Sequence, residues 1–153
     1  MYTYLRQESN TTMTKNTKKK PTILLIEDHP DIVAMYRVAF ETKLKDTLQV
    51  AMDKEEGLEK IHEIKPDLVL LDLIIPEAKG EGVKPISRHG FELLKELRKN
   101  PETKKTKVIV LTNIESTQDR KEAKRLGTLE YVVKSHTLPH EVVELTITHI
   151  EKE

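Results

Sequence analysis

The chain of 153 residues contains no cysteine and no tryptophan, and only 4% of its residues are aromatic. Without cysteine it can form neither a disulfide nor a thiolate metal site, which fits a reducing compartment. No apolar run approaches the roughly 18 residues that a membrane-spanning helix needs. The first residues also lack the apolar segment of a secretory signal. We therefore expect a cytoplasmic protein with a single domain, long enough to bury a core without disulfides.

Charge of neither sign is in excess, because 26 Lys and Arg residues balance 26 Asp and Glu residues. The distribution is uneven, however: residues 1–20 hold five basic residues and one acid, so the remainder is acidic. An acidic body does not indicate a nucleic-acid-binding surface. Residues 1–20 are rich in Thr, Asn and Lys and poor in aliphatic residues, which predicts a disordered basic tail. The simpler interpretation of this tail is a solvated leader, and the alternative is a tether to an anionic partner.

From residue 21 onward, short apolar segments alternate with segments of helical periodicity. The apolar segments are rich in Val, Ile and Leu, as buried parallel strands are. We expect strands at 22–28, 48–52, 68–73, 107–113 and 129–135. Helical segments are expected to begin near Pro30, Asp53, Gly90, Ser116 and Leu138. This alternation predicts a doubly wound α/β domain in which five helices cover both faces of a five-stranded parallel sheet.

Polar residues end four of the five expected strands. In chain order they are Glu27 and Asp28, then Asp72, Thr112 and Lys134. Ligands of doubly wound sheets bind beyond the carboxyl ends of the strands, so these side chains should meet at one edge. Each alone could be an ordinary polar residue at a strand end. Three carboxylates, a hydroxyl and an ammonium together are harder to explain by structure alone.

The chemistry of this set suggests phosphoryl transfer. Clustered carboxylates raise one another's pKa unless a cation joins them. Oxygen ligands suit a hard ion such as Mg²⁺, which combines one or two carboxylates with waters and a phosphate. A carboxylate is also a nucleophile toward phosphorus and can form an aspartyl phosphate. Such a transfer needs charge neutralisation, which Mg²⁺ and Lys134 can supply, and Thr112 can donate to a phosphoryl oxygen.

With these residues, the chain resembles the response-regulator receiver domain of two-component signalling, which has the flavodoxin-like fold of the chemotaxis regulator. The resemblance covers about residues 21–151. It depends on Glu27–Asp28, Asp72 followed by Pro76, Thr112, and the segment YVVK at 131–134. It implies the strand order 2-1-3-4-5 and a receiver domain at 21–153.

The resemblance also implies a role for each matching residue. Asp72 would be the phospho-acceptor. Asp28 and Asp72 would ligate Mg²⁺ together with the backbone carbonyl of Ile74, and Glu27 would assist through a water.

Three further residues receive switch roles from the resemblance. Thr112 would be the switch hydroxyl that is drawn toward the phosphoryl group, and Lys134 would pair with that group. Tyr131 matches the aromatic switch of the family, which swings inward when the hydroxyl moves. The alternative for Tyr131 is an ordinary strand tyrosine whose ring is half buried.

The function implied is that of a stand-alone response regulator. It would accept a phosphoryl group from a histidine kinase or phosphotransfer protein and act through altered binding to another protein. We expect no turnover of an outside substrate and no output domain, because few residues follow the last expected helix. Neither nucleic acid nor membrane is expected as a partner.

Two departures from the family pattern concern the site itself. Ser135 follows Lys134, where the family usually has proline behind a cis bond. Because a cis bond before a residue other than proline costs about 2.5–4 kcal/mol, we predict a trans bond. Ile74 and Ile114 stand two residues after the acceptor and the switch hydroxyl. Two bulky apolar side chains should not position an attacking water, so we predict a long-lived phosphorylated form.

A third departure is an extended loop at 77–89. Gly80, Gly82 and Pro85 argue against a helix through it. The simpler interpretation is a tolerated surface insertion, since longer loops add little entropic cost. The alternative is a lid or a partner contact. In that case basic residues of the loop could meet an acidic partner, namely Lys79, Lys84, Arg88 and His89.

Two other functions stay open. A receiver fold could bind partners without phosphorylation, and it would then not be labelled by acetyl phosphate. A metal-dependent phosphohydrolase would carry a second catalytic acid close after Asp72, where this chain has Leu73 and Ile74. A flavodoxin-like cofactor binder is disfavoured, because the segment EDHPD after the first strand would repel a phosphate in the absence of metal.

Overall fold

The computed structural model describes residues 19–82 and 88–152. In these ranges the chain forms one parallel sheet of five strands in the order β2-β1-β3-β4-β5, as predicted. The strands are β1 (Ile23–Ile26), β2 (Leu48–Ala51), β3 (Leu68–Leu71), β4 (Val108–Thr112) and β5 (Glu130–Val133). The helices are α1 (Pro30–Lys43), α2 (Lys54–Ile64), α3 (His89–Lys99), α4 (Thr117–Arg125) and α5 (Pro139–Glu151). Most of the predicted tail and the centre of the predicted loop lie outside the described residues.

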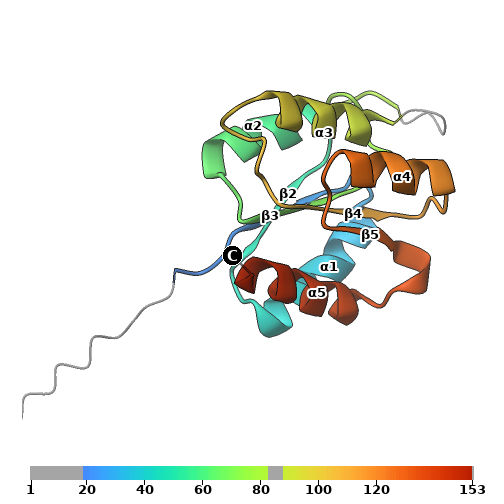
Figure 1. The fold of residues 1–153 in the computed structure, drawn as a ribbon. Helices are drawn as coiled ribbons and strands as arrows, with labels where there is room; N and C mark the ends of the chain where they lie inside the picture. The colour runs from blue at the N-terminus through green and yellow to red at the C-terminus, as the bar shows by residue number, and fades with distance from the viewer. Residues whose placement is uncertain (1–18, 83–87, 153) are drawn as a thin grey trace, which may run out of the picture.

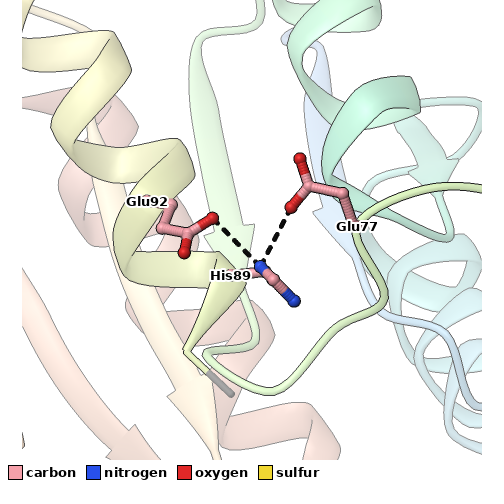
Figure 2. A group of neighbouring side chains, drawn as sticks. All are labelled: Glu77, His89 and Glu92. Atoms are coloured by element: carbon pink, nitrogen blue, oxygen red, sulfur yellow. Dashed lines mark hydrogen bonds and ion pairs between the residues drawn. The ribbon is translucent and has the colours of Figure 1, made fainter. Parts of the chain in front are cut away.

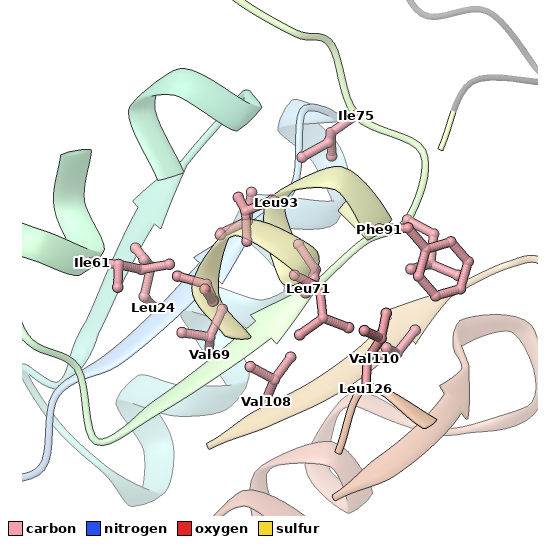
Figure 3. Packing of buried hydrophobic residues seen from close by; sticks show 14 of the residues in the cluster. Leu24, Ile61, Val69, Leu71, Ile75, Phe91, Leu93, Val108, Val110 and Leu126 are labelled. Atoms are coloured by element: carbon pink, nitrogen blue, oxygen red, sulfur yellow. The ribbon is translucent and has the colours of Figure 1, made fainter. Parts of the chain in front are cut away.

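The helices form a layer on each face of the sheet (Figure 1). Helices α2, α3 and α4 lie on one face, and α1 and α5 lie on the other. Alternate residues of a strand point to opposite faces, so each strand serves two apolar cores. In β1, Leu24 and Ile26 enter the first core, while Ile23 and Leu25 enter the second. Figure 3 shows the first core, in which Leu93 of α3 lies near the β1 and β3 side chains. Burial on both faces explains why the strand segments are apolar throughout.

Strand β3 is the central strand and pairs with both β1 and β4. All four residues from Leu68 to Leu71 are fully buried. In the β1–β3 pairing, Ile26 is the partner of Leu71. The residues that follow these two positions therefore leave the sheet side by side, at its carboxyl edge.

The residues at the starts of α1 and α2 are of types that favour the first turn of a helix. Pro30 occupies the first turn of α1, where a missing N–H is tolerated. The Asp53 carboxylate caps α2 by accepting from the Glu56 N–H at 2.8 Å. The Glu56 carboxylate in turn accepts from the Met52 N–H, also at 2.8 Å, so the two side chains satisfy backbone donors reciprocally at the helix start.

The end of β5 differs from the expectation in one respect. Lys134 and Ser135 were predicted to lie on the strand, but β5 ends at Val133 and Lys134 begins a short 3₁₀ helix, Lys134–His136. The described residues contain no cis peptide bond, so the Lys134–Ser135 bond is trans, as predicted. In the part of the chain that the structure describes, the helices lack the length and hydropathy needed to cross a bilayer.

Candidate functional site

Three carboxylates meet at the carboxyl edge of the sheet. Glu27, Asp28 and Asp72 each offer an oxygen, and these oxygens lie within 4.8 Å of one another. The β1–β3 register explains the proximity, because Glu27 and Asp72 directly follow paired residues. Glu27 is 2% exposed and Asp72 is 7% exposed, while Asp28 is half buried and opens toward solvent. We call these three residues the acidic pocket.

The Lys134 ammonium lies between two carboxylates of the acidic pocket. Its Nζ is 2.6 Å from Glu27 Oε2 and 3.0 Å from Asp72 Oδ2. Burial opposes the charge of Lys134, but the neighbouring Asp72 and Glu27 carboxylates outweigh burial and raise its pKa. The lysine therefore stays protonated and offsets part of the negative charge in the pocket. It reaches the pocket from the start of the 3₁₀ helix, with no cis bond needed to aim it.

One ammonium does not balance three carboxylates. Burial, followed by repulsion from Asp72, raises the pKa of Glu27 to about 7 despite its contact with Lys134. Burial also raises the pKa of Asp28. The pocket thus holds excess negative charge that a cation would relieve. A set of three oxygen donors without sulfur or imidazole fits Mg²⁺.

Backbone groups fix the carboxylates in place. The His29 N–H donates to Glu27 Oε1 at 3.1 Å, and the Ile74 N–H donates to Asp72 Oδ1 at 3.1 Å. Asp72 Oδ1 and Oδ2 therefore have separate partners, a backbone amide and the lysine. The proposed metal contact of the Ile74 carbonyl stays a prediction.

Gly90 supports the pocket from the start of α3, and sequence reasoning did not identify it as a site residue. Its N–H donates to the Leu73 carbonyl at 3.1 Å. A Cβ on Gly90 would lie 2.4 Å from the Asp72 carbonyl oxygen and 2.6 Å from Leu73 Cα. Both are backbone atoms, so only glycine allows α3 to approach the acceptor segment this closely. A glycine in the first turn of an expected helix was the available signal.

A hydrogen-bonded chain links Thr112 to Tyr131 through Ile114. Thr112 is fully buried, and its Oγ1 accepts from the Ile114 N–H at 3.4 Å. The Tyr131 hydroxyl donates to the Ile114 carbonyl at 2.7 Å. Burial, followed by the charge of Asp119, raises the pKa of Tyr131 to about 12, so its hydroxyl remains a donor. The two expected switch residues thus hold the same segment, the one that joins β4 to α4.

The described ends of the loop 77–89 are engaged within the chain. Arg88 Nε lies 3.4 Å from an Asp119 carboxylate oxygen. His89 Nδ1 lies 3.0 Å from carboxylate oxygens of both Glu77 and Glu92. Two of the basic residues considered for an acidic partner therefore already pair with acids of this chain.

Fold and site together define a flavodoxin-like α/β domain with a metal-compatible acidic pocket at the carboxyl edge of its sheet. The family model for the response regulator receiver domain matches residues 23–145, and the chain belongs to this family. Receiver domains are signalling modules that bind Mg²⁺ at an acidic pocket and interact with histidine kinases or phosphotransfer proteins.

Known relatives agree with this assignment. The chain is 37% identical over 113 residues to the transcriptional regulatory protein CiaR of Streptococcus pneumoniae, covering 73% of this chain and 44% of CiaR. It is 28% identical over 113 residues to Protein PilH of Pseudomonas aeruginosa, covering 73% of this chain and 84% of PilH. A crystal structure of the Mn²⁺-bound response regulator Rcp1 gives a TM-score of 0.70 at 25% identity, covering 87% of this chain and 96% of that one. The chain spans between about a quarter and a half of the length of the first curated relatives it matches.

Proposed function

We propose that this chain is a stand-alone response regulator that accepts a phosphoryl group on Asp72 from a histidine kinase or phosphotransfer protein. The observation that carries the proposal is the shared ion pairing of Lys134 with Glu27 and Asp72 inside the acidic pocket. This arrangement presents a fixed carboxylate at an edge where both a cation and a phosphoryl group can be neutralised. Mn²⁺ binding by the similar regulator Rcp1 supports a divalent metal at the pocket.

The reaction is a displacement at phosphorus. An Asp72 carboxylate oxygen attacks the phosphorus of a phosphohistidine, the P–N bond breaks, and the departing imidazole takes up a proton. The product is an acyl phosphate on Asp72. Asp28 and Asp72 would hold Mg²⁺, with the Ile74 carbonyl and with Glu27 through water. The bound ion would supply positive charge that offsets the negative charge of the transferred group.

Lys134 has two partners, and this matters after the transfer. Its shorter contact is to Glu27, at 2.6 Å, and its longer contact is to Asp72, at 3.0 Å. Glu27 can keep the ammonium in the pocket while a phosphoryl oxygen replaces the Asp72 oxygen as its second partner. The charge-assisted bond to the phosphoryl group then forms without a large movement of the lysine.

Signalling follows from the segment that Thr112 and Tyr131 share. If Thr112 turns toward the phosphoryl group, it gives up its weak contact with the Ile114 N–H. The carbonyl of the same residue holds the Tyr131 hydroxyl, so the two movements are coupled through one peptide segment. We propose that altered packing of this segment changes the affinity for a partner protein. The alternative function is a receiver fold that binds its partner without phosphorylation.

The central test is incubation with acetyl phosphate and Mg²⁺, followed by intact mass measurement. We expect one phosphoryl adduct on the wild type and none on Asp72→Asn. Asp28→Asn should be labelled much more slowly, because it removes a metal ligand. Asp31→Asn, an exposed carboxylate in the first turn of α1, is the matched control and should be labelled like the wild type. Absence of the adduct from the wild type would favour the phosphorylation-independent alternative.

The lifetime of the adduct tests the roles of Ile74 and Ile114. Both side chains are half buried, and the backbone N–H groups of the two residues contact Asp72 and Thr112, respectively. We expect the purified phosphorylated chain to lose its phosphoryl group slowly, and Ile114→Asn to shorten the lifetime by giving an attacking water a polar partner. Rapid loss from the wild type in the absence of any phosphatase would contradict this expectation.

A further inference from the structure

A second cluster of metal-binding side chains lies outside the acidic pocket. Glu77, His89 and Glu92 each present one ligand atom, and these atoms lie within 4.8 Å of one another. Figure 2 shows the His89 ring between the two carboxylates. Its Nδ1 lies 3.0 Å from Glu77 Oε2 and 3.0 Å from Glu92 Oε2. We call these three residues the clasp.

Two helices fix the positions of the clasp residues. The first N–H groups of α2 hold the segment that carries Glu77: the Lys54 N–H donates to the Pro76 carbonyl at 3.0 Å, and the Glu55 N–H donates to the Glu77 carbonyl at 3.1 Å. His89 is the first residue of α3, and Glu92 follows three positions later. This spacing places both side chains on the same face of the helix. These contacts hold the backbone positions from which the three side chains converge.

A nearly buried lysine orients the clasp. The Lys54 side chain is 11% exposed, and its Nζ lies 3.2 Å from Glu77 Oε1, 3.5 Å from Glu92 Oε2 and 3.0 Å from Glu96 Oε1. Since Lys54 occupies Oε1 of Glu77, Oε2 of the same carboxylate is left facing His89. Three carboxylates share this one ammonium, so the group keeps excess negative charge when the imidazole is neutral.

The donor chemistry differs from that of the acidic pocket. One imidazole nitrogen with two carboxylate oxygens suits a first-row transition metal such as Zn²⁺, whereas Mg²⁺ prefers oxygen ligands alone. The short separations between Nδ1 and the two oxygens allow one ion to touch all three atoms after the imidazole gives up any Nδ1 proton.

We propose that the clasp is a second metal site, which binds one divalent transition-metal ion through His89 Nδ1 and one oxygen each of Glu77 and Glu92. The ion joins Glu77, the residue that follows Pro76, to His89 and Glu92 at the start of α3. This site is separate from phosphorylation and does not depend on Asp72 being the acceptor.

Zn²⁺ titration of untagged protein in saturating Mg²⁺ tests the clasp, with affinity measured by competition against a chromophoric chelator. We expect one Zn²⁺ per chain, and at least about a tenfold loss of affinity in His89→Ala and in Glu77→Gln. Glu96→Gln is the matched control, because Glu96 contacts Lys54 but offers no ligand atom to the clasp. It should retain Zn²⁺ affinity within a few-fold of the wild type.

A second measurement separates the clasp from the acidic pocket. The double variant Asp28→Asn with Asp72→Asn should bind Zn²⁺ like the wild type, and Zn²⁺ should shift the His89 ring signals in its NMR spectrum. Circular dichroism spectra of all variants establish that each is folded. Two results would overturn the proposal: Zn²⁺ affinity that is unchanged in His89→Ala, or Zn²⁺ binding that disappears in the double variant. In either case His89 would be only an ion-pair partner of the two glutamates.

Discussion

At the scale of single residues, folding strongly changes the pKa of Glu27. Burial and then Asp72 raise its pKa from 4.5 to about 7 in the folded chain. In the unfolded chain it loses its proton near the ordinary value. Between these two values the folded state holds the proton that the unfolded state has released, so stability falls as pH rises. The destabilisation is absent below about pH 4.5 and complete above about pH 7.

Glu27→Gln should remove this pH dependence. In metal-free buffer with EDTA, we expect the variant to gain stability relative to the wild type as pH rises from 5 to 8. The relative gain should be about 1–3 kcal/mol, since one pKa unit corresponds to about 1.4 kcal/mol and Lys134 shares the charge. Urea unfolding of both proteins at the two pH values measures it. Glu63→Gln, on the exposed side of α2, controls for the loss of one carboxylate. If the stability difference between Glu27→Gln and the wild type did not change with pH, the ionisation of Glu27 would not be coupled to folding.

Two tyrosines allow a matched test of hydrogen bonding. Tyr131→Phe keeps the ring, over which the Arg120 guanidinium lies 4.7 Å from the centroid, but loses the bond to the Ile114 carbonyl. We expect a loss of about 1 kcal/mol in the free energy of unfolding. Tyr36→Phe removes a fully buried hydroxyl that has no hydrogen-bond partner among the described residues. It should leave stability unchanged or raise it. If Tyr131→Phe and Tyr36→Phe lost the same free energy of unfolding, the hydrogen bond from Tyr131 to the Ile114 carbonyl would contribute nothing to stability.

At the scale of elements, the close approach of α3 to the acceptor segment depends on Gly90. Gly90→Ala would drive a Cβ into the backbone of Asp72 and Leu73, which cannot move without displacing the carboxylate. We expect about 2–3 kcal/mol of destabilisation and strongly reduced labelling by acetyl phosphate. Gly82→Ala is the control, since nothing lies within 4 Å of a Cβ at that position. Normal labelling of a folded Gly90→Ala protein would mean that the segment adapts without moving Asp72.

The elements also show what could be predicted from the sequence. Continuous apolar segments predicted the five strands because a sheet covered on both faces exposes no polar side, and caps such as Asp53 predicted helix starts. The strand order came from the family resemblance. Contacts between α2 and α3 could not be predicted. Lys54 meets Glu77 and Glu92 only because packing brings together residues that are far apart in the sequence. No periodicity or local motif of the sequence predicts these contacts of Lys54.

At the scale of the whole molecule, the sheet edge collects charge from residues that are distant in the sequence. Lys134 and Glu27 are 107 positions apart, yet their side chains form the shortest contact of the pocket. Strand-end polarity was sufficient to predict that these residues would meet, because parallel strands share one carboxyl edge. It could not predict that Lys134 would bridge two carboxylates, since that contact depends on the 3₁₀ turn after β5.

Mg²⁺ should therefore stabilise the whole fold through the acidic pocket. A ligand that binds only the folded state adds RT ln(1 + [L]/Kd), so each tenfold rise in Mg²⁺ above its dissociation constant should add about 1.4 kcal/mol. At a fixed Mg²⁺ concentration, the gain in the free energy of unfolding should be larger at pH 8 than at pH 6. Burial raises the pKa of Glu27 to about 7, so protons compete with the metal for this carboxylate at the lower pH. Thermal unfolding of the wild type and of Asp28→Asn measures the effect, which the variant should largely lose. If Asp28→Asn were stabilised as much as the wild type at both pH values, Mg²⁺ would be acting elsewhere on the chain, and the acidic pocket would not be its site.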